Sequence, residues 1–191
     1  MLEGPAAIPV DGRQSETALL VARGTRRLLR AHGFSTVTEL TLASGRRADI
    51  VAVAPNGDIH IVEIKSSIAD FRADSKWPDY RLHCDRLFFS IPPDVPVEIM
   101  PEDAGLIIAD GFGASVLREA PVHKLAGATR RAMLLRFAQV AADRLHQLVD
   151  PGTGELAGGE RGARLARMRC RVRRCMLRRR AVSDTLRSQS S

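Results

Sequence analysis

The apolar residues of this chain fall into runs that predict a helix followed by three strands. Between Ser15 and about Ala31 apolar side chains recur with helical spacing, and Gly33 follows as a typical helix stop. Three short β-branched runs come next, at residues 36–42, 48–53 and 59–64. Because Asn56-Gly57 between two apolar runs is typical of a tight β-turn, we expect the last two strands to form an antiparallel hairpin.

The residue pattern from position 66 to 149 predicts more strands and a long helix. Residues 66–83 are polar and are expected to contain short helical turns, with Pro78 in the first turn of one of them. Strands are expected at 87–91, 105–109 and 115–117, and an amphipathic helix at 126–149. One side of that helix carries Met133, Phe137, Val140, Ala141, Leu145 and Leu148. This order predicts an α/β fold, with a central mixed sheet flanked by helices.

The composition argues against a membrane protein, a secreted protein and a zinc-binding protein. A chain of 191 residues with 45% hydrophobic residues is long enough for one domain with a real core. The chain has no run of 18 apolar residues, and its start, MLEGPAAIPVDGR, does not resemble a secretory signal. The three cysteines are sparse and lack zinc-site spacing. We therefore expect a cytoplasmic protein that does not associate with membranes.

The positive charge is concentrated at one end of the chain. The net charge is +7, but residues 1–150 carry 18 basic and 19 acidic side chains. Residues 151–191 carry 11 basic and 3 acidic side chains, and glycines precede the arginines. We therefore divide the chain into a flexible N-terminus at 1–13, a domain at 14–150, and a linker with an arginine-rich tail at 151–191.

Three interpretations of the tail stay open. It can bind nucleic acid through phosphate contacts that do not depend on base sequence. It can also be a disordered or partly helical solubilising segment, or a translated extension outside the ancestral domain.

The candidate chemistry lies on the predicted hairpin. Asp49 begins one strand, and Glu63-Ile64-Lys65 ends the other. Residues whose numbers sum to about 113 are expected to face each other, which puts Asp49 opposite Ile64 and beside both Glu63 and Lys65. Glu63 and Lys65 are two positions apart, so they point to the same face of the sheet.

This residue set suits a divalent cation and phosphodiester hydrolysis. Asp49 and Glu63 are hard oxygen ligands for Mg²⁺ or Mn²⁺, and the carbonyl of Ile64 is a further candidate ligand. Such an ion stabilises charge at phosphorus and lowers the pKa of a bound water. Lys65 can position or deprotonate that water, or stabilise the transition state. Glu16, on the first helix, can complete the acidic set.

Simpler interpretations compete with this one. An acid followed two positions later by lysine is common on exposed strands, where it forms a weak ion pair. Here isoleucines flank the triplet, and Asp49 interrupts the apolar run RADIVAV. Charges in such strands are costly unless they have a role. For Glu16, complementing the helix dipole is an equally good explanation.

The motif resembles a known nuclease superfamily. The order Glu16, then Arg47-Ala48-Asp49-Ile50, then Val62-Glu63-Ile64-Lys65 is similar to the PD-(D/E)XK superfamily, with Ala48 where proline is common. That resemblance implies a restriction-endonuclease-like core of α-β-β-β-α-β order and a catalytic set of Glu16, Asp49, Glu63 and Lys65.

A longer match covers residues 14 to about 148. The segments GRRADIVAV and VEIKSSIADFRADSKWPDYRLHCDRLFFSIP, with the alanine-rich helix at 126–149, resemble the MmcB-like DNA repair family of bacteria. This resemblance implies a role in DNA repair or damage tolerance near the nucleoid. It implies DNA as a partner, with repair polymerases or recombination proteins as further candidates.

The polar segment after the triplet supplies candidate DNA contacts. Lys76, Trp77 and Tyr80 are candidates, and the indole of Trp77 could stack on an unpaired base. The alternative is a solvated loop anchored by one buried tryptophan, with Asp79 and Asp85 as caps, and we favour a plain surface role for Asp74 and Asp79.

Two functions remain open from sequence. The first is a metal-dependent deoxyribonuclease that acts in DNA repair. The second is a catalytically inactive accessory factor that keeps the nuclease fold, binds DNA and recruits repair proteins. The four filled positions of the motif favour the enzyme.

Overall fold

A computed structural model describes residues 15–74 and 77–150. The expected flexible N-terminus, Lys76 and the arginine-rich tail lie outside the described residues. The chain divides into two compact units after Asp143, inside the last helix, and the fold presented here is that of the first unit. No helix in the described ranges is both long and apolar enough to cross a membrane.

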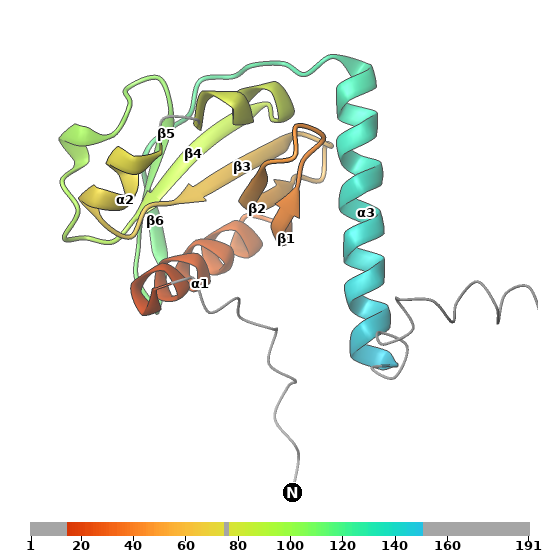
Figure 1. Cartoon of the computed structure of the whole chain (residues 1–191), viewed down its shortest axis with the longest axis horizontal. Helices are drawn as coiled ribbons and strands as arrows, with labels where there is room; N and C mark the ends of the chain where they lie inside the picture. Colours follow the sequence, from red (N-terminus) through yellow and green to blue (C-terminus); the bar gives the residue numbers. More distant parts are fainter. Residues whose placement is uncertain (1–14, 75–76, 151–191) are drawn as a thin grey trace, which may run out of the picture. The chain divides into compact units, whose positions relative to one another are not determined.

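The core is a six-stranded mixed sheet with strand order β1-β2-β3-β4-β5-β6 (Figure 1). The strands β3, β4 and β5 run parallel, and the other neighbouring pairs are antiparallel. This arrangement confirms the mixed sheet flanked by helices. In chain order the elements are α1 (Glu16–Ala31), β1 (Ser35–Thr41), β2 (Arg47–Val53), β3 (Ile59–Ile64), α2 (Ile68–Ala73), η1 (Trp77–His83), β4 (Arg86–Ile91), η2 (Val97–Ile99), β5 (Gly105–Ala109), β6 (Ala114–Arg118) and α3 (Gly127–Val149).

Alternating side chains of the strands build apolar clusters on both faces of the sheet. On one face, α1 contributes Val21 and Leu29, which pack with Val62 of β3 and with its neighbours on β2, β4 and β5. On the other face, Met133 of α3 packs with Ile61 of β3 and with η1. Leu145 and Leu148, farther along the predicted apolar side of α3, are exposed.

The hairpin between β2 and β3 has a longer turn than expected. Gly57 N–H donates to Ala54 O at 2.9 Å, and Ala54 N–H donates to Asp58 O at 2.9 Å. Gly57 has a φ of +84°, so residues 55–57 form a three-residue loop in which glycine takes the left-handed position. The observed register pairs Ile50 with Val62. Numbers of facing residues therefore sum to 112, and the expected sum of 113 was wrong by one residue.

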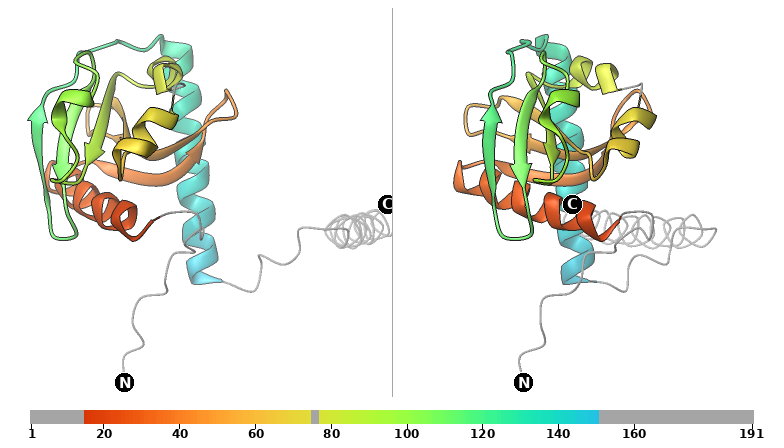
Figure 2. Two further views of the ribbon diagram at one scale, coloured as in Figure 1. Left: turned by 60° about the vertical axis from the view of Figure 1, so that its left-hand side comes forward. Right: turned by 90° about the vertical axis from the view of Figure 1, so that its left-hand side faces the viewer.

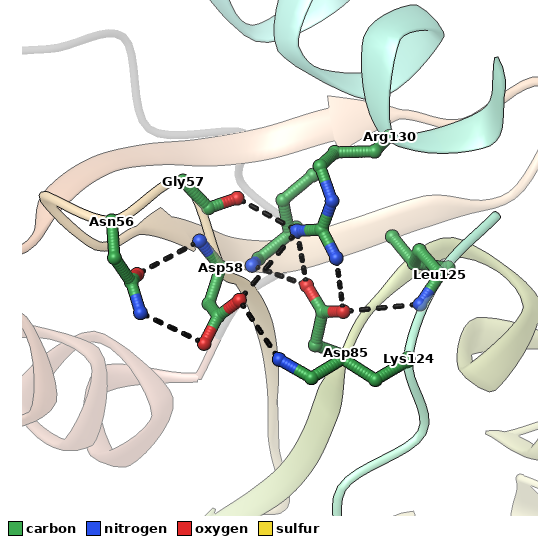
Figure 3. Close-up of polar contacts among 8 residues, drawn as sticks. Asn56, Gly57, Asp58, Asp85, Lys124, Leu125 and Arg130 are labelled. Carbon is green, nitrogen blue, oxygen red and sulfur yellow. Dashed lines mark hydrogen bonds and ion pairs between the residues drawn. The ribbon is translucent and has the colours of Figure 1, made fainter. Parts of the chain in front are cut away.

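Asp85 ties the start of β3 to the beginning of α3 (Figure 3). Its carboxylate is almost fully buried and accepts two hydrogen bonds from Arg130, at 2.6 and 2.7 Å. It also accepts backbone hydrogen bonds from Ile59 at 2.8 Å and Leu125 at 3.1 Å. Burial disfavours the charged form, but these hydrogen bonds outweigh it and lower the pKa of Asp85 to about 2. Asp85 therefore connects β3 to the start of α3 and is not the local cap that the sequence suggested.

Replacing Asp85 by asparagine is expected to lower the free energy of unfolding by about 3 kcal/mol, because it leaves Arg130 without its buried partner. The pKa of Asp85 is lowered, so its contribution is present above about pH 4 and is lost as the pH falls toward 2. Urea unfolding between pH 2 and 7 measures both effects.

Asp79 provides the matched control, since it pairs with Arg46 at 2.7 Å on the surface and its side chain is 51% exposed. The Asp79→Asn variant is expected to cost less than about 1 kcal/mol. Equal losses in the two variants would contradict the central role of Asp85.

Candidate active site

Asp49 and Glu63 face each other on neighbouring strands. The pairing of β2 with β3 ends at Ile50 and Val62, and Asp49 and Glu63 are the next residues of the two strands beyond that pair. Asp49 N–H donates to Glu63 Oε1 at 3.3 Å, and Ile64 N–H donates to Asp49 Oδ2 at 2.8 Å. Each carboxylate therefore accepts a hydrogen bond from the backbone of the opposite strand. Glu63 points to the face of the sheet that is opposite to α1, because its neighbours Val62 and Ile64 pack with α1.

Burial and mutual repulsion make this carboxylate pair electrostatically costly. Glu63 is only 3% exposed. Burial first, and the neighbouring charge of Asp49 second, raise the pKa of Glu63 well above its usual value. Burial also raises the pKa of Asp49 to about 6, although the hydrogen bond from Ile64 opposes the shift. Without a bound cation, the pair therefore tends to retain a proton near neutral pH.

Lys65 lies just past β3 and is held by Asp74. The lysine is 5% exposed, and its Nζ lies 2.6 Å from Asp74 Oδ2. Asp74 follows α2, whose N-cap Ser67 accepts a hydrogen bond from Asp70 N–H at 3.1 Å. The plain surface role favoured for Asp74 was therefore wrong, because folding of α2 brings this acid back onto the lysine. Asp79 does have the expected surface role, in its ion pair with Arg46.

Glu39 is a neighbour of the site that sequence reasoning missed. Its position on β1 lies between Thr38, which pairs with Ile50, and Leu40, which pairs with Ala48, so Glu39 is across from Asp49. Glu39 has a φ of 52°, an uncommon conformation for a residue other than glycine. Its carboxylate forms an ion pair with Arg47, and its charge contributes to the raised pKa of Asp49. In the sequence, Glu39 looked like an ordinary polar residue of an edge strand.

Tyr80 is beside the carboxylates, whereas Trp77 is partly buried and packs against the core. The Tyr80 hydroxyl is close to Glu63 and donates to Arg47 O at 3.1 Å. Burial, followed by the charges of Glu63 and Asp49, raises the pKa of Tyr80. Trp77 packs edge-on against Phe89 at 5.5 Å, and Arg81 lies 5.1 Å from the indole centre. These contacts agree with the anchoring role of Trp77 and leave Tyr80 as a support for Glu63.

Glu16 lies near the same end of the sheet as the carboxylates, but it belongs to α1, which packs on the opposite face from Glu63. A Cβ atom built on Gly111, past the end of β5, would lie 2.8 Å from Leu20, so the first half of α1 is near the carboxyl ends of the parallel strands. Phe34, which follows α1, contacts His60 at the start of β3. Glu16 is exposed in the first turn of α1. Within the described ranges, no hydrogen bond or ion pair joins it to Asp49 or Glu63.

The donor set fits a cation that keeps most of its own water ligands. Within residues 15–74 and 77–150, no group of three His, Cys, Asp or Glu side chains is arranged to hold a metal ion. Mg²⁺ often binds proteins through one or two carboxylates and completes its shell with water and phosphate oxygens. The facing pair Asp49 and Glu63 meets that requirement, and a cation would relieve their repulsion.

Comparisons with known proteins agree with this fold. In a search of solved structures, a protein of unknown function from Silicibacter pomeroyi matches with a TM-score of 0.72 and 44% sequence identity. The alignment covers 74% of this chain and 98% of that chain. A search of curated proteins finds no match. The family model described as DNA repair protein MmcB-like matches residues 6–152, most of the chain, and the protein therefore belongs to the MmcB-like DNA repair family.

Proposed function

We propose that this protein is a Mg²⁺- or Mn²⁺-dependent deoxyribonuclease that acts in DNA repair, on a PD-(D/E)XK core. The observation that supports the proposal most directly is the facing pair Asp49 and Glu63, with Lys65 on the same face. Asp49 and Glu63 would hold the ion, and the carbonyl of Ile64 is a further candidate ligand. When bound, such an ion supplies positive charge to the phosphate and lowers the pKa of a water. Glu16 remains a candidate for the acidic set.

Lys65 would bind and stabilise the reacting phosphate. Its ammonium group donates to Asp74, so we assign Lys65 a donor role and not that of a general base. A donor held in a buried, ordered position stabilises developing negative charge with little reorganisation. Asp74 would act as a positioning residue, because its contact fixes the direction of the lysine side chain. Tyr80 would help to hold Glu63 in place, because its hydroxyl lies close to that carboxylate and is fixed by its hydrogen bond to Arg47 O.

The second candidate function is that of a catalytically inactive accessory protein. Within the described ranges, no group of three or more His, Cys, Asp or Glu side chains is arranged to hold a metal ion, and Lys65 is already paired with an acid. An accessory protein that uses the fold to bind DNA and to recruit repair polymerases or recombination proteins needs no more than this. The two functions differ in whether the carboxylate pair binds a divalent cation.

We expect the purified protein to cleave single-stranded, branched or damaged DNA when Mg²⁺ or Mn²⁺ is added. Lys65→Ala should lower the cleavage rate by at least about 100-fold, because it removes a donor to the transition state. Lys124→Ala is a matched control, since that side chain is 71% exposed, and it should retain the wild-type rate. Gel-based cleavage assays measure these rates.

Calorimetry separates the enzyme from the accessory factor. Wild-type protein should bind Mn²⁺, and Asp49→Asn should lose most of that binding because only one ligand carboxylate remains. If wild-type protein neither binds the ion nor cleaves any of the substrates, the nuclease proposal is wrong and the accessory function is favoured.

The contact between Lys65 and Asp74 is expected to show strong energetic coupling. Asp74→Asn should lower the free energy of unfolding by about 3 kcal/mol, because it leaves a buried lysine without its partner. Adding Lys65→Met should recover part of that loss, with a coupling energy of about 1 to 3 kcal/mol. Urea unfolding of the single and double variants measures the coupling. Additive losses would mean that Asp74 does not hold Lys65 in solution.

A further inference from the structure

The helix α1 carries a row of exposed arginines on the side away from the core. Arg23, Arg26, Arg27 and Arg30 recur at intervals of three and four residues, with Arg26 and Arg27 adjacent, so they share one side of the helix. Together with residues 33–36 they line an open hollow of about 790 Å³. Among the described residues that line the hollow, none is acidic.

This concentration of charge is not a general property of the domain. Residues 1–150 carry 18 basic and 19 acidic side chains, so this segment is nearly neutral overall although one helix carries several arginines. Arginines at these spacings repel one another and weaken an isolated helix. A row of this kind is stabilised when a polyanion binds along it.

The turn between β5 and β6 is docked tightly against the same helix (Figure 2). A Cβ atom at Gly24 would lie 2.2 Å from Asp110 O and 2.3 Å from Gly113 O, so only glycine permits this approach. Arg27 Nη1 donates to Phe112 O at 2.9 Å. Helix and turn are thereby fixed relative to each other.

The docked turn presents an aromatic side chain to solvent. Phe112 is 87% exposed, the highest value among the large apolar side chains in the described ranges. Its backbone is ordered by Asp110, whose Oδ1 accepts from Phe112 N–H at 2.7 Å and from Gly113 N–H at 2.9 Å. Exposing an apolar ring has a cost in water, and packing within the domain does not account for it.

We propose that α1 and Phe112 form a binding surface for an unpaired nucleic acid strand. The arginines would contact the phosphates, and the Phe112 ring would stack on a base. From Arg23 to Arg30 the helix rises about 10 Å, enough to face two or three phosphates. A basic track beside an aromatic ring is the usual pattern for single strands, whose bases are free to stack. The inference rests on the proposed function for nucleic acid as the ligand and adds that this ligand contains an unpaired region.

Fluorescence anisotropy with the full chain tests the surface, using a labelled 20-nucleotide oligothymidylate and a duplex of equal length. EDTA is present throughout, so the result does not depend on metal binding or cleavage. Phe112→Ala should weaken oligothymidylate binding by roughly 5- to 100-fold, as expected for the loss of one stacked base, and Phe112→Trp should restore it. Duplex binding should change much less.

The arginines are tested through the salt dependence of binding. The double variant R23A/R26A should bind oligothymidylate more weakly and lower the slope of log affinity against log salt by about 1.4, the value for two lost phosphate contacts. It leaves Arg27 in place to hold the turn. The matched control R131A/R136A, on α3, should keep the wild-type slope, and the arginine-rich tail is present in every variant.

Leu82→Ala controls for the loss of an exposed apolar side chain, since Leu82 is 70% exposed on η1. The proposal is overturned if Phe112→Ala binds oligothymidylate as tightly as wild type, if Leu82→Ala causes an equal loss, or if R23A/R26A leaves the salt slope unchanged. Loss of cleavage in Lys65→Ala with normal strand binding would support both proposals separately. Normal strand binding by a protein that never cleaves DNA would support this surface and contradict the nuclease.

Discussion

The hydrogen-bonded register between β2 and β3 is the constraint on which the candidate active site depends. The three-residue loop at 55–57 pairs Ile50 with Val62, and therefore sets Asp49 against Glu63. Side chains alternate between faces along a strand, so a register shifted by one residue would change which side chain of β3 lies beside Asp49. The left-handed conformation of Gly57 makes this loop possible, although it is distant from the site along the strands.

The site keeps its charges in an arrangement that is costly without a ligand. Asp49 and Glu63 repel each other in a buried setting, and Glu39 adds a third negative charge nearby. The charge of Lys65, which is paired with Asp74, offsets only part of this effect, because the pKa values of both carboxyl groups stay raised. At the other end of β3, Asp85 joins the strand to α3 by hydrogen bonds with Ile59 and Arg130 (Figure 3). Electrostatic strain at a rigid site is typical of sites that bind ions or charged substrates.

Positive and negative groups are separated within the first unit. Glu63 lies on the face of the sheet that is opposite to α1, while α1 carries the arginines on its outer side. The helix runs from near the carboxyl ends of the parallel strands toward the start of β3. A polyanion guided by the arginines would approach the domain along α1.

The sequence by itself determined the elements and the identity of the central residues. Short β-branched runs, helical spacing and glycine turns gave bounds for β3 and β5 that agree with the structure, and the E-x-K triplet marked the end of β3. These signals are local, because alternation and turn chemistry depend on neighbouring residues. Tertiary structure decided which residues distant in the sequence lie in contact. The strand register brings Asp49 to Glu63, and the fold of α2 brings Asp74 to Lys65. The docking of α3 brings Arg130 to Asp85, and the close approach at Gly24 brings Phe112 to Arg27. Such contacts depend on loop geometry and packing between distant segments, for which one sequence carries no periodic signal.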